Sequence, residues 1–331
     1  MENKDLYTRI PLPKPSFFFS YEDTVVLMGS CFAENVGKKL EENKFRVDTN
    51  PFGTLYNPAS VAKALHRLLR PDAFTASDLF YREEVYHSFA HHSRFSSPSE
   101  KECLNRINGR LLSSAQHLKE ANRLIITFGT AFVYKWTSTG EIVSNCHKLP
   151  EKLFKRERLT VGEIVEEWQN LLPALWKQNP ALKVLFTVSP IRHWKDGAHG
   201  NQLSKATLLL AIEALEKQYP GQIAYFPAYE IMMDELRDYR FYADDMLHPS
   251  PLAVDYIWDR FRENIFTKET QAALKEWTEI QKALRHKPFQ PESETYKRFI
   301  SQTLLKMERI KEKFPFFDLT NEIGTIKSKL T

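Results

Sequence analysis

Cysteine is scarce in this chain: there are three among 331 residues, Cys31, Cys103 and Cys146. An odd number without the paired spacing of metal ligands argues against a disulfide framework and against a cysteine-based zinc site. No apolar run approaches the length of a membrane span. The first residues are charged and no hydrophobic stretch follows them, so the sequence shows no secretory signal. These absences predict a soluble protein of a reducing compartment, the cytoplasm, without a membrane partner.

An excess of charge of either sign is also missing. The 46 basic and 42 acidic residues leave a net charge of +4, which does not indicate a nucleic-acid partner. What the chain does have is apolar material for a sizeable core, since 42% of its residues are hydrophobic. Its length suits one large domain or two ordinary ones.

The stretch from Thr24 to Glu42 predicts a strand, a sharp turn and a helix. Residues 25–28 form a short continuous apolar run, typical of a central parallel strand covered on both faces. Gly29 permits a tight turn. Ser30 then stands where the carboxyl end of a strand meets a helix N-terminus, which is where open α/β sheets bind ligands. Ser30 can simply cap the helix, or it can serve as a nucleophile if a base reaches it.

A segment far along the chain offers such a base. Asp245 and His248 lie three residues apart, just before an amphipathic pattern over residues 251–261 that predicts a helix. In the turn before a helix both side chains can point into one cleft, so that the carboxylate orients the imidazole. The alternative is a solvated turn beside a helix cap at Ser250.

These two segments resemble a known family. Gly29-Ser-Cys-Phe-Ala33 resembles the signature that names the GSCFA family, which is placed with the SGNH (GDSL-like) hydrolases, and Asp245-x-x-His248 resembles the last block of that superfamily. The resemblance extends over about residues 20–266. It implies a flavodoxin-like three-layer α/β/α sandwich and hydrolysis of an ester by Ser30, His248 and Asp245, without a cofactor or metal.

The resemblance also implies an oxyanion hole. Superfamily members form it from two backbone N–H groups and one Asn side chain. The N–H groups belong to the positions that match Ser30 and Gly53, and the Asn comes from a Gly-x-Asn sequence after the third strand of the sheet. Here that Asn position is Ala131, which has no side-chain donor. Losing one such donor costs about 3 to 4 kcal/mol of transition-state stabilisation, so Thr130 and Asn145 are the candidates to replace it.

Three further residues are candidates for substrate binding. Residues 143–150 resemble the second characteristic stretch of the family, and this implies a place in the pocket for Asn145 or His147; without the family, the segment is an ordinary polar loop. Arg192 and His193 follow an apolar strand over residues 183–189, where they can hold an anionic or hydroxyl-rich substrate or form a surface pair.

The remaining pattern predicts the domain plan. Alternating strands and helices over residues 1–266 indicate a mainly parallel sheet of five strands, with β-hairpins inserted near 78–95 and 134–145. His87, His91 and His92 raise the idea of zinc, but no carboxylate or cysteine spacing accompanies them, and a role for one of them in lining the pocket is favoured. Residues 267–331 predict a charged helical extension, packed on the domain or joining two copies in a homo-oligomer.

We therefore expect an esterase that acts on a small-molecule or carbohydrate ester through Ser30, His248 and Asp245. The same groups would support acyl transfer if an alcohol replaced water. One rival is a catalytically silent binding or assembly protein that retains the fold, which the missing Asn supports. Another rival is Cys31 as a thiol nucleophile. We expect Ser30 to face the pocket, and the side chain of its neighbour Cys31 would then point away from it.

Overall fold

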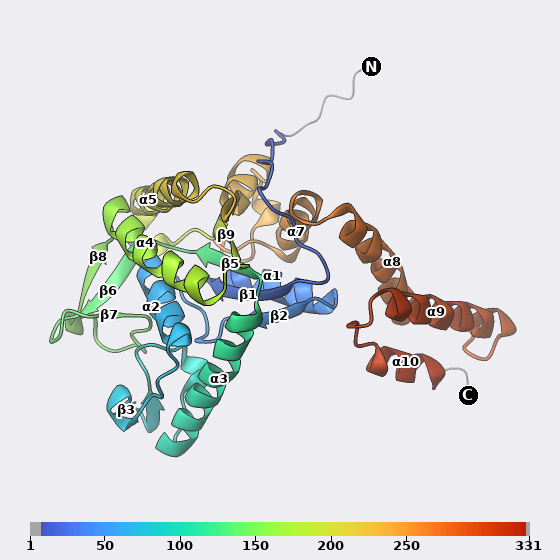
Figure 1. Ribbon diagram of the computed structural model, residues 1–331, viewed down its shortest axis with the longest axis horizontal. Coiled ribbons are helices and arrows are strands. Elements are labelled where there is room, and N and C mark those ends of the chain that lie inside the picture. Colours follow the sequence, from blue (N-terminus) through green and yellow to red (C-terminus); the bar gives the residue numbers. More distant parts are fainter. Residues whose placement is uncertain (1–7, 329–331) are drawn as a thin grey trace.

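Five parallel strands form the central sheet of the computed structural model, which describes residues 8–328. Their order is β10–β9–β5–β1–β2 (Figure 1), which is the flavodoxin-like order of a doubly wound sheet. The strands are β1 (Thr24–Gly29), β2 (Arg46–Thr49), β5 (Arg123–Phe128), β9 (Lys183–Val188) and β10 (Ile223–Phe226). The chain reverses its direction of progress between β1 and β5, so a ligand crevice is expected beyond the carboxyl ends of those two strands.

Helices cover both faces of this sheet and make it the middle of three layers, which confirms the predicted fold (Figure 1). Alternation along β1 shows why: Val26 and Met28 pack into one apolar core, and Val25 and Leu27 into the other. The first core lies under α2 (Pro58–Leu69), α3 (Glu100–Glu120), α4 (Val161–Gln178) and α5 (Gly197–Gln218), and the second lies under α1 (Cys31–Glu42), α6 (Ala228–Glu230) and α7 (Pro251–Ile265).

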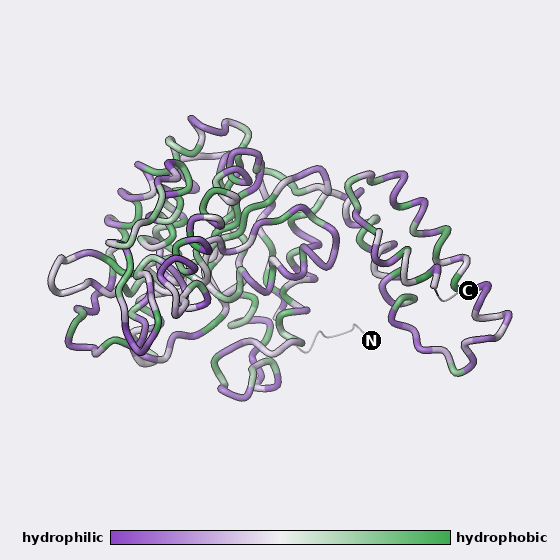
Figure 2. Tube along the Cα trace, turned by 90° about the horizontal axis from the view of Figure 1, so that it is seen from below, coloured by the Kyte–Doolittle hydropathy of each residue, from purple (hydrophilic) through white to green (hydrophobic). Residues whose placement is uncertain are grey.

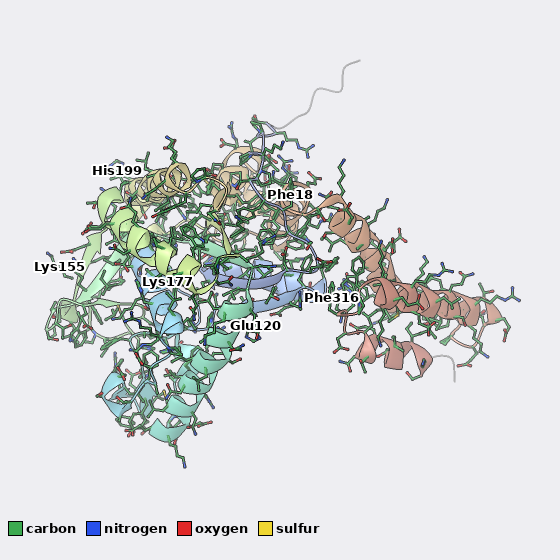
Figure 3. All side chains as sticks on the ribbon, viewed as in Figure 1. Phe18, Glu120, Lys155, Lys177, His199 and Phe316 are labelled. Carbon is green, nitrogen blue, oxygen red and sulfur yellow. The ribbon has the colours of Figure 1, made fainter. Side chains whose placement is uncertain are left out.

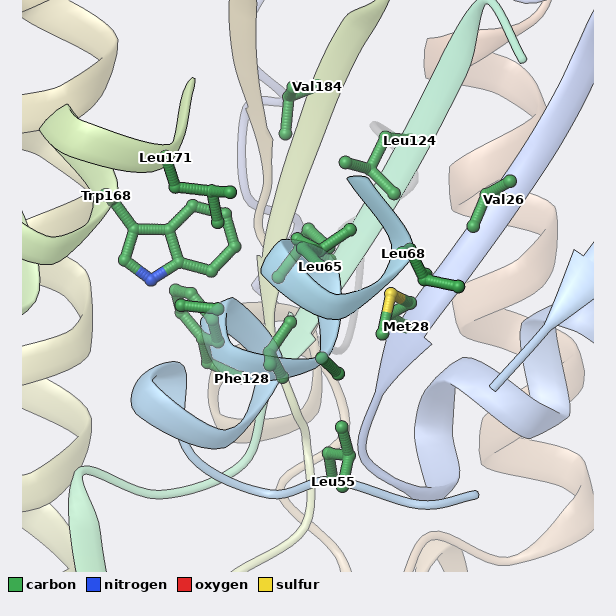
Figure 4. Packing of buried hydrophobic residues seen from close by; sticks show 14 of the residues in the cluster. Val26, Met28, Leu55, Leu65, Leu68, Leu124, Phe128, Trp168, Leu171 and Val184 are labelled. Carbon is green, nitrogen blue, oxygen red and sulfur yellow. The ribbon is translucent and has the colours of Figure 1, made fainter. Parts of the chain in front are cut away.

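Large side chains fill the first core. Trp168 of α4 is fully buried and meets Phe128 of β5 edge to face, with 5.2 Å between ring centroids (Figure 4). Leu65 and Leu68 of α2 pack into the same core, on the helix that lies across the sheet in Figure 4. Because such a core is close-packed, it holds the ends of the strands in fixed positions. Those ends carry the polar loops described below.

Two antiparallel insertions extend from the sandwich. β3 (Phe80–Arg82) and β4 (Val85–His87) form a hairpin, and β6 (Phe132–Trp136) lies between β7 (Ile142–Val143) and β8 (Phe154–Arg158). The sequence did not lead us to expect β8, because Lys155 to Arg158 are all charged. Side chains at its tip, such as Lys155, project into solvent (Figure 3).

Short turns of 3₁₀ or wider helix complete the connections. The 3₁₀ turns lie at Ala76–Asp78, Ser93–Phe95, Glu151–Leu153, Trp194–Asp196 and Tyr239–Phe241, and a π-helical turn spans Ile231–Glu235.

Three C-terminal helices pack beside the β2 edge of the sheet: α8 (Lys268–Arg285), α9 (Glu294–Lys313) and α10 (Thr320–Lys327) (Figure 1). Trp277 donates its indole N–H to the carbonyl of Glu42 at 2.9 Å, and Phe317 meets Tyr21 at 4.7 Å between centroids. Phe316 lies at the same junction (Figure 3), under the guanidinium of Arg46. Hydrophobic and hydrophilic residues alternate along these helices (Figure 2), and their apolar side joins the second core. The extension therefore packs on its own domain, while assembly into a homo-oligomer stays a prediction.

Within residues 8–328, no helix is both long enough and apolar enough to cross a bilayer.

Candidate active site

A cavity of about 860 Å³ opens at the carboxyl ends of β1, β5 and β9. Cys31 lines it directly after β1, Thr130 after β5, and residues 191–195 after β9. The other walls come from Thr54, Tyr56 and Asn57 after β2, from His92, from the antiparallel insertion between residues 132 and 156, and from Leu247 and His248 before α7. The cavity thus lies at the crevice that the strand order predicts.

Ser30 is not among the residues that line this cavity, contrary to our expectation. Its side chain has no exposed surface, and its Oγ accepts a hydrogen bond from the N–H of Phe32 at 3.3 Å, as a helix N-cap does. Its own N–H is used as well, because it donates to the carbonyl of Thr127 at 3.1 Å. In this structure Ser30 closes the turn, and both its hydroxyl and its amide take part in hydrogen bonds within it.

Cys31 lines the cavity instead, so the expectation that it points away is wrong. The turn explains the exchange. Gly29 has a φ of +137°, and a Cβ there would lie 2.1 Å from the carbonyl oxygen of Thr127, so the chain turns sharply beside β5. The Ser30 side chain then folds back over the helix start, and the next residue, the first of α1, projects into the opening.

Opposing effects act on the Cys31 thiol. Burial raises its pKa to about 11, while the N–H groups of Cys31 and Phe32 and the charge of Lys205 act in the opposite direction. The amide of Cys31 is one of those that a helix N-terminus leaves without an intrahelical acceptor. The thiol therefore rests protonated, beside backbone dipoles that favour negative charge.

Asp245 and His248 form the contact that their spacing predicts. Oδ2 of Asp245 lies 2.5 Å from Nδ1 of His248, and Oδ1 accepts from the N–H groups of Leu247 and His248 at 3.0 and 2.9 Å. These backbone bonds, followed by the bond to the ring, lower the pKa of Asp245 to about 2. With Nδ1 held by a carboxylate, Nε2 is the ring nitrogen left to the cavity that His248 lines.

The predicted oxyanion donors differ in their placement. The N–H of Gly53 donates to the carbonyl of Asn50 at 2.8 Å, and Thr54, not Gly53, lines the cavity. Thr130 lines it, but its hydroxyl lies 3.0 Å from Oγ of Ser204. Asn145 lines it with an amide NH₂ group that has no hydrogen-bond partner in the part of the chain that the structure describes. Of the four predicted donors, Asn145 is the one left free.

His147 is not a cavity residue, which corrects its predicted place in the pocket. It is buried, its Nε2 lies 2.8 Å from the carbonyl oxygen of Ser88, and its ring lies 4.6 Å from that of His87. Burial lowers its pKa to about 4, so it is neutral at physiological pH. Its N–H donates to Oδ1 of Asn145 at 2.9 Å, and His147 thus anchors the loop that presents Asn145.

Arg192 and His193 both line the cavity, as we expected. Nε2 of His193 is buried without a partner among the described residues. A Cβ added to Gly129 would lie 2.9 Å from this nitrogen and 3.5 Å from Cβ of Ser30. Burial, and next the charge of Lys205, lower the pKa of His193 to about 3. A neutral imidazole therefore stands over the ends of β1 and β5.

Lys205 is a polar residue of this region that the sequence did not reveal. It is buried in α5, within a stretch that is otherwise strongly apolar, and its Nζ donates to the carbonyls of Gly129 and Ser189 at 2.8 Å each. Burial lowers its pKa to about 7. A lysine in an apolar helix was the available signal, but sequence alone does not distinguish a buried amine from one that reaches solvent.

The clustered histidines take separate positions. His91 is buried and stacks on Phe52 at 4.7 Å, while His92 lines the cavity. Between residues 8 and 328, no three His, Cys, Asp or Glu side chains lie close enough together to hold a metal ion.

Comparison with known proteins gives the family. A model of the GSCFA family matches residues 24–261, which hold the whole sheet and every residue of the cavity. The chain belongs to the GSCFA family. A second model, of the C-terminal domain of GSCFA domain proteins, matches residues 277–331. Of the pentapeptide Gly29-Ser-Cys-Phe-Ala33 of this GSCFA protein, Cys31 is the residue that lines the cavity.

Beyond the family, the likenesses are remote. No curated protein matches the chain. A solved structure from Streptococcus pneumonia, provisionally described as a platelet activating factor, shares 8% sequence identity with a TM-score of 0.38; the match covers 74% of this chain and 84% of that one.

Proposed function

We propose that this GSCFA protein is an acyl hydrolase with an SGNH-like arrangement of base and orienting carboxylate, in which the Cys31 thiol replaces the serine nucleophile, His248 is the base and Asp245 orients it, and that it cleaves an ester. The observation that carries the proposal is that Cys31 and an Asp245-bound His248 line the same cavity, at the carboxyl ends of the central strands. The predicted nucleophile Ser30 lies beneath this cavity as a helix cap. A role for Ser30 as nucleophile would require its side chain to leave that cap.

The reaction follows from the state of each group. Because burial raises the pKa of Cys31 to about 11, the thiol needs a base at the moment of attack. Nε2 of His248 takes the thiol proton as the sulfur bonds to the ester carbonyl carbon. The tetrahedral intermediate then breaks its carbon–oxygen bond, and the leaving alkoxide takes the proton from His248. Water, deprotonated by His248, attacks the thioester and releases the acid and the thiol.

Two groups are available to the oxyanion of that intermediate. They are the N–H of Cys31 at the helix start and the NH₂ of Asn145. A pKa of about 3 keeps His193 neutral, and its buried Nε2 would join them as a donor only if the ring turned toward the cavity. Together they would replace the donors that Ala131 lacks and that Ser30 and Gly53 have already committed. If an alcohol entered in place of water, the same steps would give acyl transfer.

The experiment measures hydrolysis of short-chain aryl esters by the full chain. We expect Cys31→Ala to lower kcat/KM by about a thousandfold or more, and mass spectrometry of the wild type to show an acyl group on the peptide that contains Cys31. Cys146→Ala is the matched control, since Cys146 lines the same cavity and burial raises its pKa to about 11 as well. If Ser30→Ala abolished turnover while Cys31→Ala retained it, the serine mechanism would stand instead.

A silent binding protein is the second candidate. The observation that favours it is that the amides of Ser30 and Gly53, which the superfamily would use for the oxyanion, are bonded internally. Reaction with an ester probe separates the two functions. Labelling of the wild type that His248→Ala prevents supports the enzyme, whereas the absence of labelling by fluorophosphonates, chloroacetamides and activated esters alike supports the silent protein.

A further inference from the structure

The walls of the cavity carry more positive charge than the chain as a whole. Four long cationic side chains line it against one carboxylate, that of Glu151; the four are Lys148, Arg156, Arg192 and Lys195. Across the whole sequence, basic residues exceed acidic ones by only four. The cavity is therefore a local concentration of positive charge, at the place where a substrate would bind.

Two of these cations are already neutralised. Arg156 binds Asp196 through two hydrogen bonds of 2.7 and 2.6 Å, and Nζ of Lys195 lies 2.6 Å from a carboxylate oxygen of Glu151. Arg192 and Lys148 form no ion pair with any carboxylate between residues 8 and 328. The unbalanced charge of the cavity thus comes from these two side chains.

Arg192 is held in position, but not by an anion. Its guanidinium lies over the ring of Trp194 at 5.2 Å, and its Nε is buried without a partner among the described residues. Its backbone N–H points to the carbonyl of Leu247, at a long 3.5 Å, in the loop that carries His248. The terminal N–H groups of the guanidinium form no hydrogen bond with any residue between 8 and 328, and because Arg192 lines the cavity they are the donors that a bound anion would meet, close to the proposed base.

Lys148 comes from the loop that His147 anchors. His147 and Lys148 have φ values of 46° and 56°, a left-handed conformation that non-glycine residues adopt rarely. The bonds of His147 to Ser88 and Asn145 hold the loop in this shape. Such conformations persist where the surroundings impose them, so the loop fixes where the exposed Lys148 enters the cavity.

Aromatic rings form a further part of the wall. Tyr56, Phe132, Tyr134, Phe154 and Trp194 line the cavity, and Trp194 is 51% exposed. Rings of this kind accept a carbon chain or the apolar face of a sugar. The cavity therefore combines an apolar wall with two unpaired cations.

We infer that the ligand of this cavity carries a carboxylate or phosphate group, held by Arg192 and Lys148, attached to a carbon chain or ring that lies on the aromatic wall. That the ligand is an ester rests on the proposed function; the recognition of its negative charge does not. Arginine suits the role because its guanidinium binds both carboxylate and phosphate through paired hydrogen bonds.

Binding to the full-length Cys31→Ala protein tests the inference without turnover. The three probes each carry a para-nitrophenyl ring: para-nitrobenzoate, para-nitrophenyl phosphate and the neutral para-nitrobenzyl alcohol. Calorimetry measures the Kd of each. We expect at least one anion to bind about tenfold or more tightly than the alcohol, with an advantage that shrinks as ionic strength rises. The stronger of the two anions identifies the group.

Variants locate the effect. Arg192→Gln should remove most of the advantage of the anion, Lys148→Gln should reduce it, and Arg192→Lys should restore part of it if the protein is folded by circular dichroism. Lys152→Gln is the matched control, because Lys152 lies in the same loop region and does not line the cavity. Equal binding of the anions and the alcohol, or an anion advantage that survives both glutamine variants, would overturn the inference.

Turnover separates this inference from the proposed function. The wild type is given two aryl esters with the same leaving group, para-nitrophenyl butyrate and para-nitrophenyl hemisuccinate. Anion binding without cleavage of either ester would sink the hydrolase and leave the anion site standing. Cleavage of both esters, without tighter binding of the anions than of the alcohol, would overturn the anion site and leave the hydrolase standing.

Discussion

The two ends of the central sheet are built differently. At the amino ends, Asn122 joins three strands: its Oδ1 accepts from the N–H of Thr24 at 3.0 Å, its N–H donates to the carbonyl of Thr24, and its carbonyl accepts from Lys183. Beside it, Asp23 pairs with Arg123 at 3.2 Å and is almost completely buried. This end is closed by contacts between neighbouring strands.

The carboxyl ends are open. They hold a buried amine at Lys205, a ring nitrogen of His193 that has no partner between residues 8 and 328, and a cavity between the strands and the inserted hairpins. Buried polar groups without partners cost stability and persist where they serve another purpose. Because the cavity lies at the carboxyl ends, we expect changes at the amino ends to affect stability and changes at the carboxyl ends to affect activity, and this can be tested by changing each end separately.

The largest effect is expected at the Asp245–His248 pair. His248→Ala should lower kcat/KM by about a thousandfold or more, and Asp245→Asn should follow it closely, because the imidazole would lose the carboxylate that fixes its tautomer. Both side chains are exposed, so the free energy of unfolding should change by no more than about 0.5 kcal/mol. Steady-state kinetics and urea unfolding of the same samples measure the two quantities, with Asp244→Asn as the control. A stability loss that accounts for the lost activity would contradict the assignment.

Lys205, at the carboxyl end of the sheet, should make the free energy of unfolding depend on pH. The pKa of this lysine is about 7 when folded and 10.5 in the unfolded chain, so between these values the unfolded chain binds a proton that the folded chain does not. Its contribution to stability must then rise with pH, by about 1.4 kcal/mol per unit above pH 7. Below pH 7 it is protonated in both states and the slope vanishes.

Lys205→Met is the variant that isolates this slope. The difference in free energy of unfolding between wild type and variant, from urea titrations at several pH values, cancels the other titrating groups. A difference that is flat from pH 7 to pH 9 would mean that the amine stays charged in the fold. As a neutral amine Lys205 still has two N–H donors, which match the two carbonyls that it binds.

Asp23→Ala probes the closed end. It leaves Arg123 without its carboxylate, although that side chain also donates to the carbonyl of Phe18. We expect a loss of about 2 to 4 kcal/mol in the free energy of unfolding and unchanged kcat/KM per folded molecule, since Asp23 precedes β1 at the end opposite the cavity. Asp23→Asn, which keeps the shape, should lose less. An equal loss of activity would show that the two ends are coupled.

The central sheet was predictable from the sequence, because mainly apolar runs such as residues 25–28 and 183–188 are typical of buried parallel strands. The contact between Asp245 and His248 was equally accessible, since three residues of spacing in a turn nearly fix it. Strand β8 was not, because its charged residues pair within one small antiparallel sheet and show no apolar pattern.

The choice between Ser30 and Cys31 shows why the site was harder to predict than the fold. Both residues follow Gly29, and which of them enters the cavity depends on the backbone angles of the cap, not on residue type. Likewise, His147 and His193 are both histidines in polar loops after or near strands, yet one is anchored to Ser88 and the other lines the cavity. Side-chain direction at a strand end is a tertiary property.

The smallest effect is expected for Ser30→Ala. This variant separates a structural role from a chemical one most directly, because Ser30 and Cys31 are neighbours in the chain. If Ser30 is only a cap, Ser30→Ala should lower the free energy of unfolding by about 1 kcal/mol, the usual worth of a serine N-cap, and leave kcat/KM within about threefold of wild type. Thr160→Ala is the matched control, since Thr160 caps α4 through the N–H of Glu163. Similar stability losses in the two variants, with activity kept in both, would place the chemistry on Cys31. A collapse of activity in Ser30→Ala alone would instead mean that the Ser30 side chain leaves its cap during the reaction.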